Sequence, residues 1–328
     1  MKAAKPIITA AAIVVLTIIT FVCATDKDSA STSYNEKIQA NLNVPHVYSP
    51  KIPETMDFCG EKVPLDIYYV RESLDREMIV NTYGHTSTLL YLKRAHRYFP
   101  IIEPILKRNG IPDDFKYLCV IESGLTNATS PAKAQGFWQF MKTTGQKYGL
   151  EVTDEIDMRN NLEAATEAAC KFLKVLHNNL GSWTAAAAAY NCGEAGLSKN
   201  MEKQSIESYY DTRLNSETSR YIYRILAVKQ IMKHPQEYGF FLRPTDLYPS
   251  LPTRTATLSG QNVDIYAFAK ENGCSYKVFR ELNPWITTEK LTNKSNKSYT
   301  VKLPTAEGLS LKKIRTDRDK GSNFITEM

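Results

Sequence analysis

The chain has 328 residues, of which 43% are hydrophobic and 23% are charged, enough for one sizeable domain and a smaller one. Its net charge of +6 is modest, and no block of lysines and arginines or nucleic-acid motif is present, so we expect no nucleic-acid partner. The six cysteines are scattered and fit neither a metal motif nor a dense disulfide framework. No metal and no cofactor is therefore indicated. Whether one disulfide forms stays open.

Residues 1–24 have the pattern of an export signal. Lys2 and Lys5 precede an apolar run that extends from Pro6 to Ala24. Three interpretations are open: cleavage after Ala24, a lipoprotein attached through Cys23, or an uncleaved membrane anchor. Each of them predicts that the rest of the chain is exported to the periplasm or another part of the cell envelope.

The next two regions differ sharply in pattern. Residues 25–61 are polar and interrupted by prolines, which predicts a flexible linker. Over 62–240 apolar residues recur at helical spacing and strand signals are absent, which predicts an all-helical domain with an N-terminal helical extension. Gly84 should divide its first helical run, and a separate short helix is expected over 99–109, around two prolines.

The following helix leads to an acid. One stripe, at spacings i, i+3, i+4 and i+7, consists of Phe115, Leu118, Cys119 and Glu122. A carboxyl on the buried face of a helix has a raised pKa, which suits a general acid near neutral pH. The alternative is that Glu122 lies at a frayed helix end and faces water.

The remaining elements follow from the same spacing rules. Helices are expected over 138–148, from about 161 to 180, over an alanine-rich run that Ser182 can cap, and over 220–234. Prolines mark a linker at 241–254. Residues 255–305 then change to a strand, two short helices (263–272 and 276–282) and a final strand, and 306–328 form a charged tail.

Four segments in this order resemble the motifs of the lytic transglycosylase family, whose domain shares its fold with goose-type lysozyme. They are IESGL at 121–125, SPAKAQGFWQFM at 130–141 with YGL at 148–150, AAAYNCG at 187–193 and SETSRYIYRILAV at 216–228. The resemblance extends to the membrane-bound type D members, which append LysM modules. Residues 255–305 resemble a degenerate LysM module, with SGQNV in place of the usual SGDTL.

The resemblance implies a mainly α fold: a lysozyme-like all-helical catalytic domain with a small C-terminal β-α-α-β module. It implies an enzyme that acts on peptidoglycan glycan strands and cleaves between N-acetylmuramic acid and N-acetylglucosamine. Glu122 would first protonate the leaving oxygen and then, as a base, help to form a 1,6-anhydro product. The substrate-binding positions that it implies are Ser130, Gln139, Tyr190, Asn191, Glu217 and Tyr221.

Three of the carried-over positions also have a simpler interpretation. Ser130 can merely shape a turn before Pro131, and Asn191 can merely cap the alanine-rich helix. Glu217 can be a surface acid paired with Arg220.

Two other functions are also open. A lysozyme-type hydrolase needs a second carboxylate to position water, and those nearest in sequence are Asp154, Asp157 and Glu163. A non-catalytic peptidoglycan-binding protein would keep the fold and the LysM-like module without the chemistry.

Overall fold

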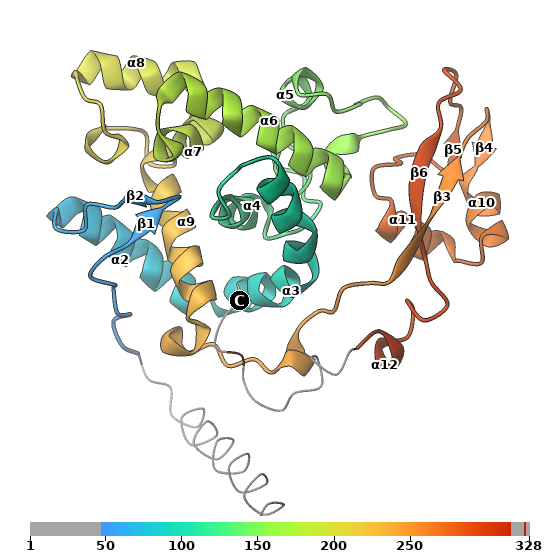
Figure 1. The fold of residues 1–328 in the computed structure, drawn as a ribbon, viewed down its shortest axis with the longest axis horizontal. Coiled ribbons are helices and arrows are strands. Elements are labelled where there is room, and N and C mark those ends of the chain that lie inside the picture. The colour runs from blue at the N-terminus through green and yellow to red at the C-terminus, as the bar shows by residue number, and fades with distance from the viewer. Residues whose placement is uncertain (1–46, 316–324, 326–328) are drawn as a thin grey trace, which may run out of the picture. The chain divides into compact units, whose positions relative to one another are not determined.

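The computed structural model of the chain describes residues 47–315 and residue 325. Its first part is a short hairpin followed by helices (Figure 1). The elements are β1 (Asp57–Phe58), β2 (Glu61–Lys62), α2 (Tyr68–Tyr83), α3 (His85–Arg108), α4 (Phe115–Ser123), α5 (Lys142–Lys147), α6 (Leu162–Leu180), α7 (Trp183–Cys192), α8 (Glu194–Gln204) and α9 (Thr218–Lys233). Short 3-10 turns lie at Met158–Asn160, Tyr209–Asp211, Pro235–Tyr238 and Pro244–Asp246.

Helix α4 lies at the centre of the helical part (Figure 1). All seven residues from Phe115 to Ile121 are buried. Helices α3 and α9 pack against α4, α9 also packs against α2 and α7, and α6 packs against α3 and α7. Because these helices enclose α4, the position of its last turn is fixed.

Helix α3 corrects one prediction. The stretch 99–108 is helical as expected, but it is not a separate short helix, because α3 continues unbroken through Pro100 and Pro104. Each proline removes a backbone donor and crowds the preceding turn, at about 3 kcal/mol or more. The same stretch buries Phe99 and Ile102 along with two further aliphatic side chains, each worth about 1.5–3 kcal/mol. Packing therefore outweighs the local penalty.

Two further helices depart from expectation. The helix predicted over 138–148 is reduced to α5, because Gln139 has a φ of +48° and Phe140 instead exchanges backbone hydrogen bonds with Gln135. Helix α8 has no counterpart among the predicted elements. By contrast, Ser182 caps α7 as predicted; Asn161 caps α6, and Gly181 ends α6 in the left-handed region.

The linker predicted over 25–61 is wrong for its last part. Phe58 is fully buried in the core, and Glu61 binds the first turn of α7. Its carboxylate accepts hydrogen bonds from the backbone N–H groups of Trp183 (2.6 Å) and Thr184 (2.9 Å). Polar composition concealed this hairpin, because the carboxylate is satisfied by a helix that begins more than a hundred residues later.

The second part has the predicted β-α-α-β order. Strands β3 (Thr253–Leu258) and β6 (Tyr299–Pro304) pair antiparallel, from Thr253 opposite Pro304 to Leu258 opposite Tyr299. Between them lie α10 (Ile265–Glu271), α11 (Tyr276–Leu282) and a small unpredicted ladder of β4 (Val263–Asp264) and β5 (Lys290–Leu291), and α12 (Leu311–Ile314) follows. The preceding proline-marked stretch is held on α3, where Arg97 donates to the Pro249 carbonyl at 2.9 Å.

Within residues 47–315, no helix is long and apolar enough to span a membrane. The predicted export segment lies outside the described residues. The five cysteines from Cys59 onward are all free thiols, and Cys119 and Cys170 are buried as predicted.

Candidate active site

Glu122 lies in the last turn of α4, whose end is fixed by Gly124. This glycine has a φ of +59°, and a Cβ at its position would lie 2.9 Å from the ring of Tyr91. Two arginines from the flanking helices hold the carbonyls at this helix end. Arg94 donates to the Gly124 carbonyl at 2.9 Å, and Arg224 donates to the Ile121 carbonyl at 3.2 Å.

The surroundings of Glu122 favour its protonated form. Burial raises the pKa of Glu122 from the ordinary 4.5 to about 7, and the negative charge of Glu217 acts in the same direction. A hydrogen bond from Tyr221 and the positive charge of Arg224 oppose this rise. Near neutral pH both forms are populated, as a group that first gives and then takes a proton requires.

Helix α9 brings three side chains toward this acid. Glu217, Tyr221 and Arg224 follow at i, i+4 and i+7 and so share one face of the helix. The Tyr221 hydroxyl donates to Glu122 Oε1. Sequence analysis named Glu217 and Tyr221 but missed Arg224, which the same helical spacing would have found.

Tyr190 and Gln139 fix the loop that faces α4. The Tyr190 hydroxyl donates to the Trp138 carbonyl at 2.7 Å, and burial together with the negative charge of Glu122 raises its pKa well above the ordinary value. The Gln139 side-chain amide donates to the carbonyls of Ala128 (2.9 Å) and Gly136 (2.8 Å). Both side chains therefore hold the loop, and the Tyr190 hydroxyl lies close enough to the acid to feel the charge of Glu122.

Asn191 and Glu217 contact each other across α7 and α9. The Asn191 side chain accepts from the Thr218 hydroxyl at 3.0 Å and donates to Glu217 at 3.5 Å. Arg220, the alternative partner of Glu217, forms its ion pair with Glu77 instead. The surface pairing considered for Glu217 is therefore not the one formed.

Ser130 lies in a turn of the 130–141 loop. Its hydroxyl accepts from the Ala134 backbone N–H at 2.9 Å, and its own N–H donates to the Ala134 carbonyl at 2.9 Å. Within the described residues, no contact joins Ser130 to Glu122. The geometry supports its turn-shaping interpretation.

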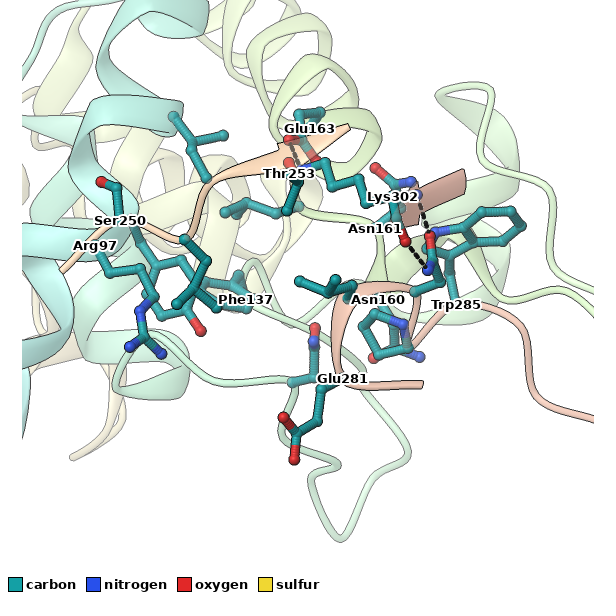
Figure 2. Close-up of a pocket in the computed structure, with 18 of the residues that line it drawn as sticks. Arg97, Phe137, Asn160, Asn161, Glu163, Ser250, Thr253, Glu281, Trp285 and Lys302 are labelled. Carbon is teal, nitrogen blue, oxygen red and sulfur yellow. Dashed lines mark hydrogen bonds and ion pairs between the residues drawn. The ribbon is translucent and has the colours of Figure 1, made fainter. Parts of the chain in front are cut away.

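The carboxylates nearest in sequence serve other contacts. Asp157 is paired with Arg159 at 2.6 Å, and Glu163 is paired with Lys302 of the β-α-α-β part. Figure 2 shows this second pair in the wall of a cavity of about 610 Å³ between the two parts. Asp154 accepts through its carbonyl from the Thr287 hydroxyl. Glu217, rather than any of these three, is the carboxylate whose charge acts on Glu122.

Sequence reasoning also missed Arg159, which is buried behind the loop at 130–141. Its guanidinium donates to the carbonyls of Lys133 (3.2 Å) and Phe140 (3.1 Å). A Cβ at Gly136 would lie 1.9 Å from the Arg159 carbonyl oxygen, so only glycine fits there. Among the described residues, no group of three or more potential metal ligands is present.

Two family models match the chain. The transglycosylase SLT domain matches residues 99–212, and the soluble lytic transglycosylase C-terminal LysM-like domain matches residues 254–307. The chain carries an SLT domain and a LysM-like domain. The SLT match includes Glu122 and the loop at 130–141 and ends before α9, so Glu217 and Tyr221 are placed beside the acid by the structure alone.

Two relatives match part of the chain. Membrane-bound lytic murein transglycosylase D of Escherichia coli (strain K12) is 32% identical over 198 residues, which cover 58% of this chain and 43% of that protein. A putative tributyltin chloride resistance protein of Alteromonas sp. (strain M-1) is 29% identical over 103 residues, 31% of this chain and 50% of that protein. The chain therefore spans less than half the length of the first relative.

Proposed function

We propose that this protein is a peptidoglycan lytic transglycosylase with Glu122 as its acid and base. The observation that carries the proposal is one half-buried carboxyl at the end of α4 within an SLT domain, whose pKa is about 7 and which accepts a hydrogen bond from Tyr221. The relative named as a murein transglycosylase supports the same substrate. The name of that relative also supports a cell-envelope location and a membrane attachment, to which residues 1–24 would contribute.

The proposed reaction needs one carboxyl group. Protonated Glu122 gives its proton to the oxygen between N-acetylmuramic acid and N-acetylglucosamine, and the bond from that oxygen to muramyl C1 breaks. The acetamido oxygen of the substrate stabilises the cationic C1, as in substrate-assisted glycosidases. The muramyl C6 hydroxyl then attacks C1 and passes its proton to Glu122, which restores the acid. The products are an N-acetylglucosamine end and a 1,6-anhydro ring, and no water is consumed.

The surrounding residues have distinct proposed roles. The Tyr221 hydroxyl stabilises ionised Glu122 after the first proton transfer. Gln139 and Tyr190 shape the loop that faces the substrate, and Asn191 holds Glu217 at the edge of the site. Ser130 is proposed to contribute only through its turn.

Glu217 keeps a lysozyme-type hydrolase as a second candidate, because its charge acts on Glu122. The test compares wild type, Glu122→Gln and Glu217→Gln on purified sacculi, with soluble muropeptides measured by mass spectrometry. A transglycosylase loses all release with Glu122→Gln and keeps substantial release with Glu217→Gln. Reducing-end products that vanish with Glu217→Gln would establish the hydrolase. A folded wild-type protein that binds sacculi but releases nothing would establish a binding protein.

A further inference from the structure

One segment of the SLT domain is built into the LysM-like module. Ile156 is 2% exposed, and it belongs to the hydrophobic core of the module together with Leu258, Phe279 and Trp285. Its backbone forms an antiparallel bridge with Ile286, in the connection between α11 and β5. A tethered module with a free surface would not depend on a side chain from the neighbouring domain for its core.

Hydrogen bonds on both sides of Ile156 extend this contact. The Asp157 N–H donates to the Trp285 carbonyl at 2.8 Å, and the Thr287 N–H donates to the Glu155 carbonyl at 2.9 Å. The Glu155 carboxylate accepts from the backbone N–H of Thr292 at 2.9 Å. The segment thus pairs with the module as an added strand does, so that main-chain bonds fix its position.

The same segment continues directly to Arg159. The Asp157 carboxylate receives a bidentate pair from Arg159, with Nε–Oδ1 at 2.8 Å and Nη2–Oδ2 at 2.6 Å, and both side chains are nearly buried. A bidentate pair fixes the orientation of the guanidinium plane as well as the position of its charge. The remaining donor of Arg159 reaches the carbonyls of Lys133 and Phe140, on either side of the Gly136 contact.

We propose that the LysM-like module braces the loop at 130–141 through residues 151–157, and that Arg159 is the positioning residue that transmits this support. The loop carries Gln139 in a left-handed conformation, which needs such support to persist. The consequence for turnover rests on the proposed function, whereas the brace itself does not. The module is then a structural member of the catalytic domain, whatever else it binds.

The first test measures hydrogen exchange in the full chain. Ile156→Ala should raise the exchange rates of loop amides 133–140 about tenfold or more, because it weakens the segment behind Arg159. The matched control is Leu303→Ala, which empties an equally buried position of the same core on β6, opposite Arg254 of β3. Measurements are made below the onset of thermal unfolding. Loop exchange that is unchanged in Ile156→Ala, or that rises equally in both variants, overturns the brace.

The second test concerns Arg159. Arg159→Lys keeps a positive charge beside Asp157. A lysine, however, cannot form the bidentate pair with Asp157 and also donate to the carbonyls of Lys133 and Phe140. Loop exchange should rise about tenfold, and on sacculi kcat should fall while KM and the alkaline limb set by Glu122 remain unchanged. Arg243→Lys, at an exposed pair with Asp246, is the control. A fall in melting temperature without altered loop exchange would make Arg159 merely structural and overturn its positioning role. If the loop exchange changes as expected but wild type has no activity, the proposed function fails and the brace stands.

Discussion

Replacing Glu122 by glutamine should stabilise the fold at alkaline pH and have little effect in acid. Burial raises the pKa of Glu122 from 4.5 to about 7 in the folded protein, whereas in the unfolded chain the group returns to its ordinary value. The folded state therefore binds the proton more tightly, and folding stability declines as pH rises from 4.5 to about 7. At about 1.4 kcal/mol per pKa unit, the full loss is about 3 kcal/mol. Glutamine keeps an oxygen that can accept from Tyr221 and carries no charge, so it avoids this loss.

The assay is urea unfolding of wild type and Glu122→Gln at about pH 5 and about pH 8.5, on either side of most of the titration. The free energies of unfolding should be similar at the lower pH and differ by roughly 2–3 kcal/mol in favour of the variant at the higher pH. Glu72→Gln, at an exposed glutamate of α2, controls for loss of a surface charge. A gain that is independent of pH, or equal in both variants, would refute the reasoning that burial makes Glu122 costly to ionise.

Three further substitutions test the surroundings of the acid and the fold. Tyr221→Phe removes the hydrogen bond that lowers the pKa of Glu122, so the alkaline limb of the pH–rate profile should move to higher pH while kcat falls about tenfold to hundredfold. Glu217→Gln removes a charge that raises this pKa, so the same limb should move to lower pH. Glu61→Ala should cost about 1–3 kcal/mol near neutral pH, measured by thermal unfolding at several pH values. Burial opposes ionisation of Glu61, but hydrogen bonds from the first turn of α7, led by Thr184, lower its pKa, so its stabilisation should be present above pH 4.5 and be lost as pH falls further.

Local patterns predicted those elements whose local and tertiary preferences agree. The cap at Ser182 and the β-α-α-β order of the LysM-like module required only short-range information. The unbroken α3 could not be predicted in this way. Its prolines favour a break, and only the burial of residues such as Phe99 and Ile102 in the assembled core reverses that preference.

In the candidate site, too, local patterns predicted some residues, whereas contacts between distant parts of the chain could not be predicted. The apolar stripe on α4 left open whether Glu122 is buried or faces water; the side chain is half-buried, and desolvation raises its pKa to about 7. Arg159 and Glu61 were missed because their roles depend on partners distant in the chain: the carbonyls of the 130–141 loop for Arg159 and the first turn of α7 for Glu61. No sequence periodicity indicates contacts between residues so distant in the chain. In the sequence, a polar loop residue that faces water cannot be distinguished from one that binds another segment.

The measurement that tests the central claim most directly is digestion of sacculi in water labelled with oxygen-18, followed by mass spectrometry of the muropeptides. Transglycosylation by Glu122 uses the substrate's own C6 hydroxyl, so the new ends should be 1,6-anhydro rings that carry no heavy oxygen. Products with reducing ends that contain one heavy oxygen would show that water attacks C1. That result would contradict the account and assign the protein to the hydrolases.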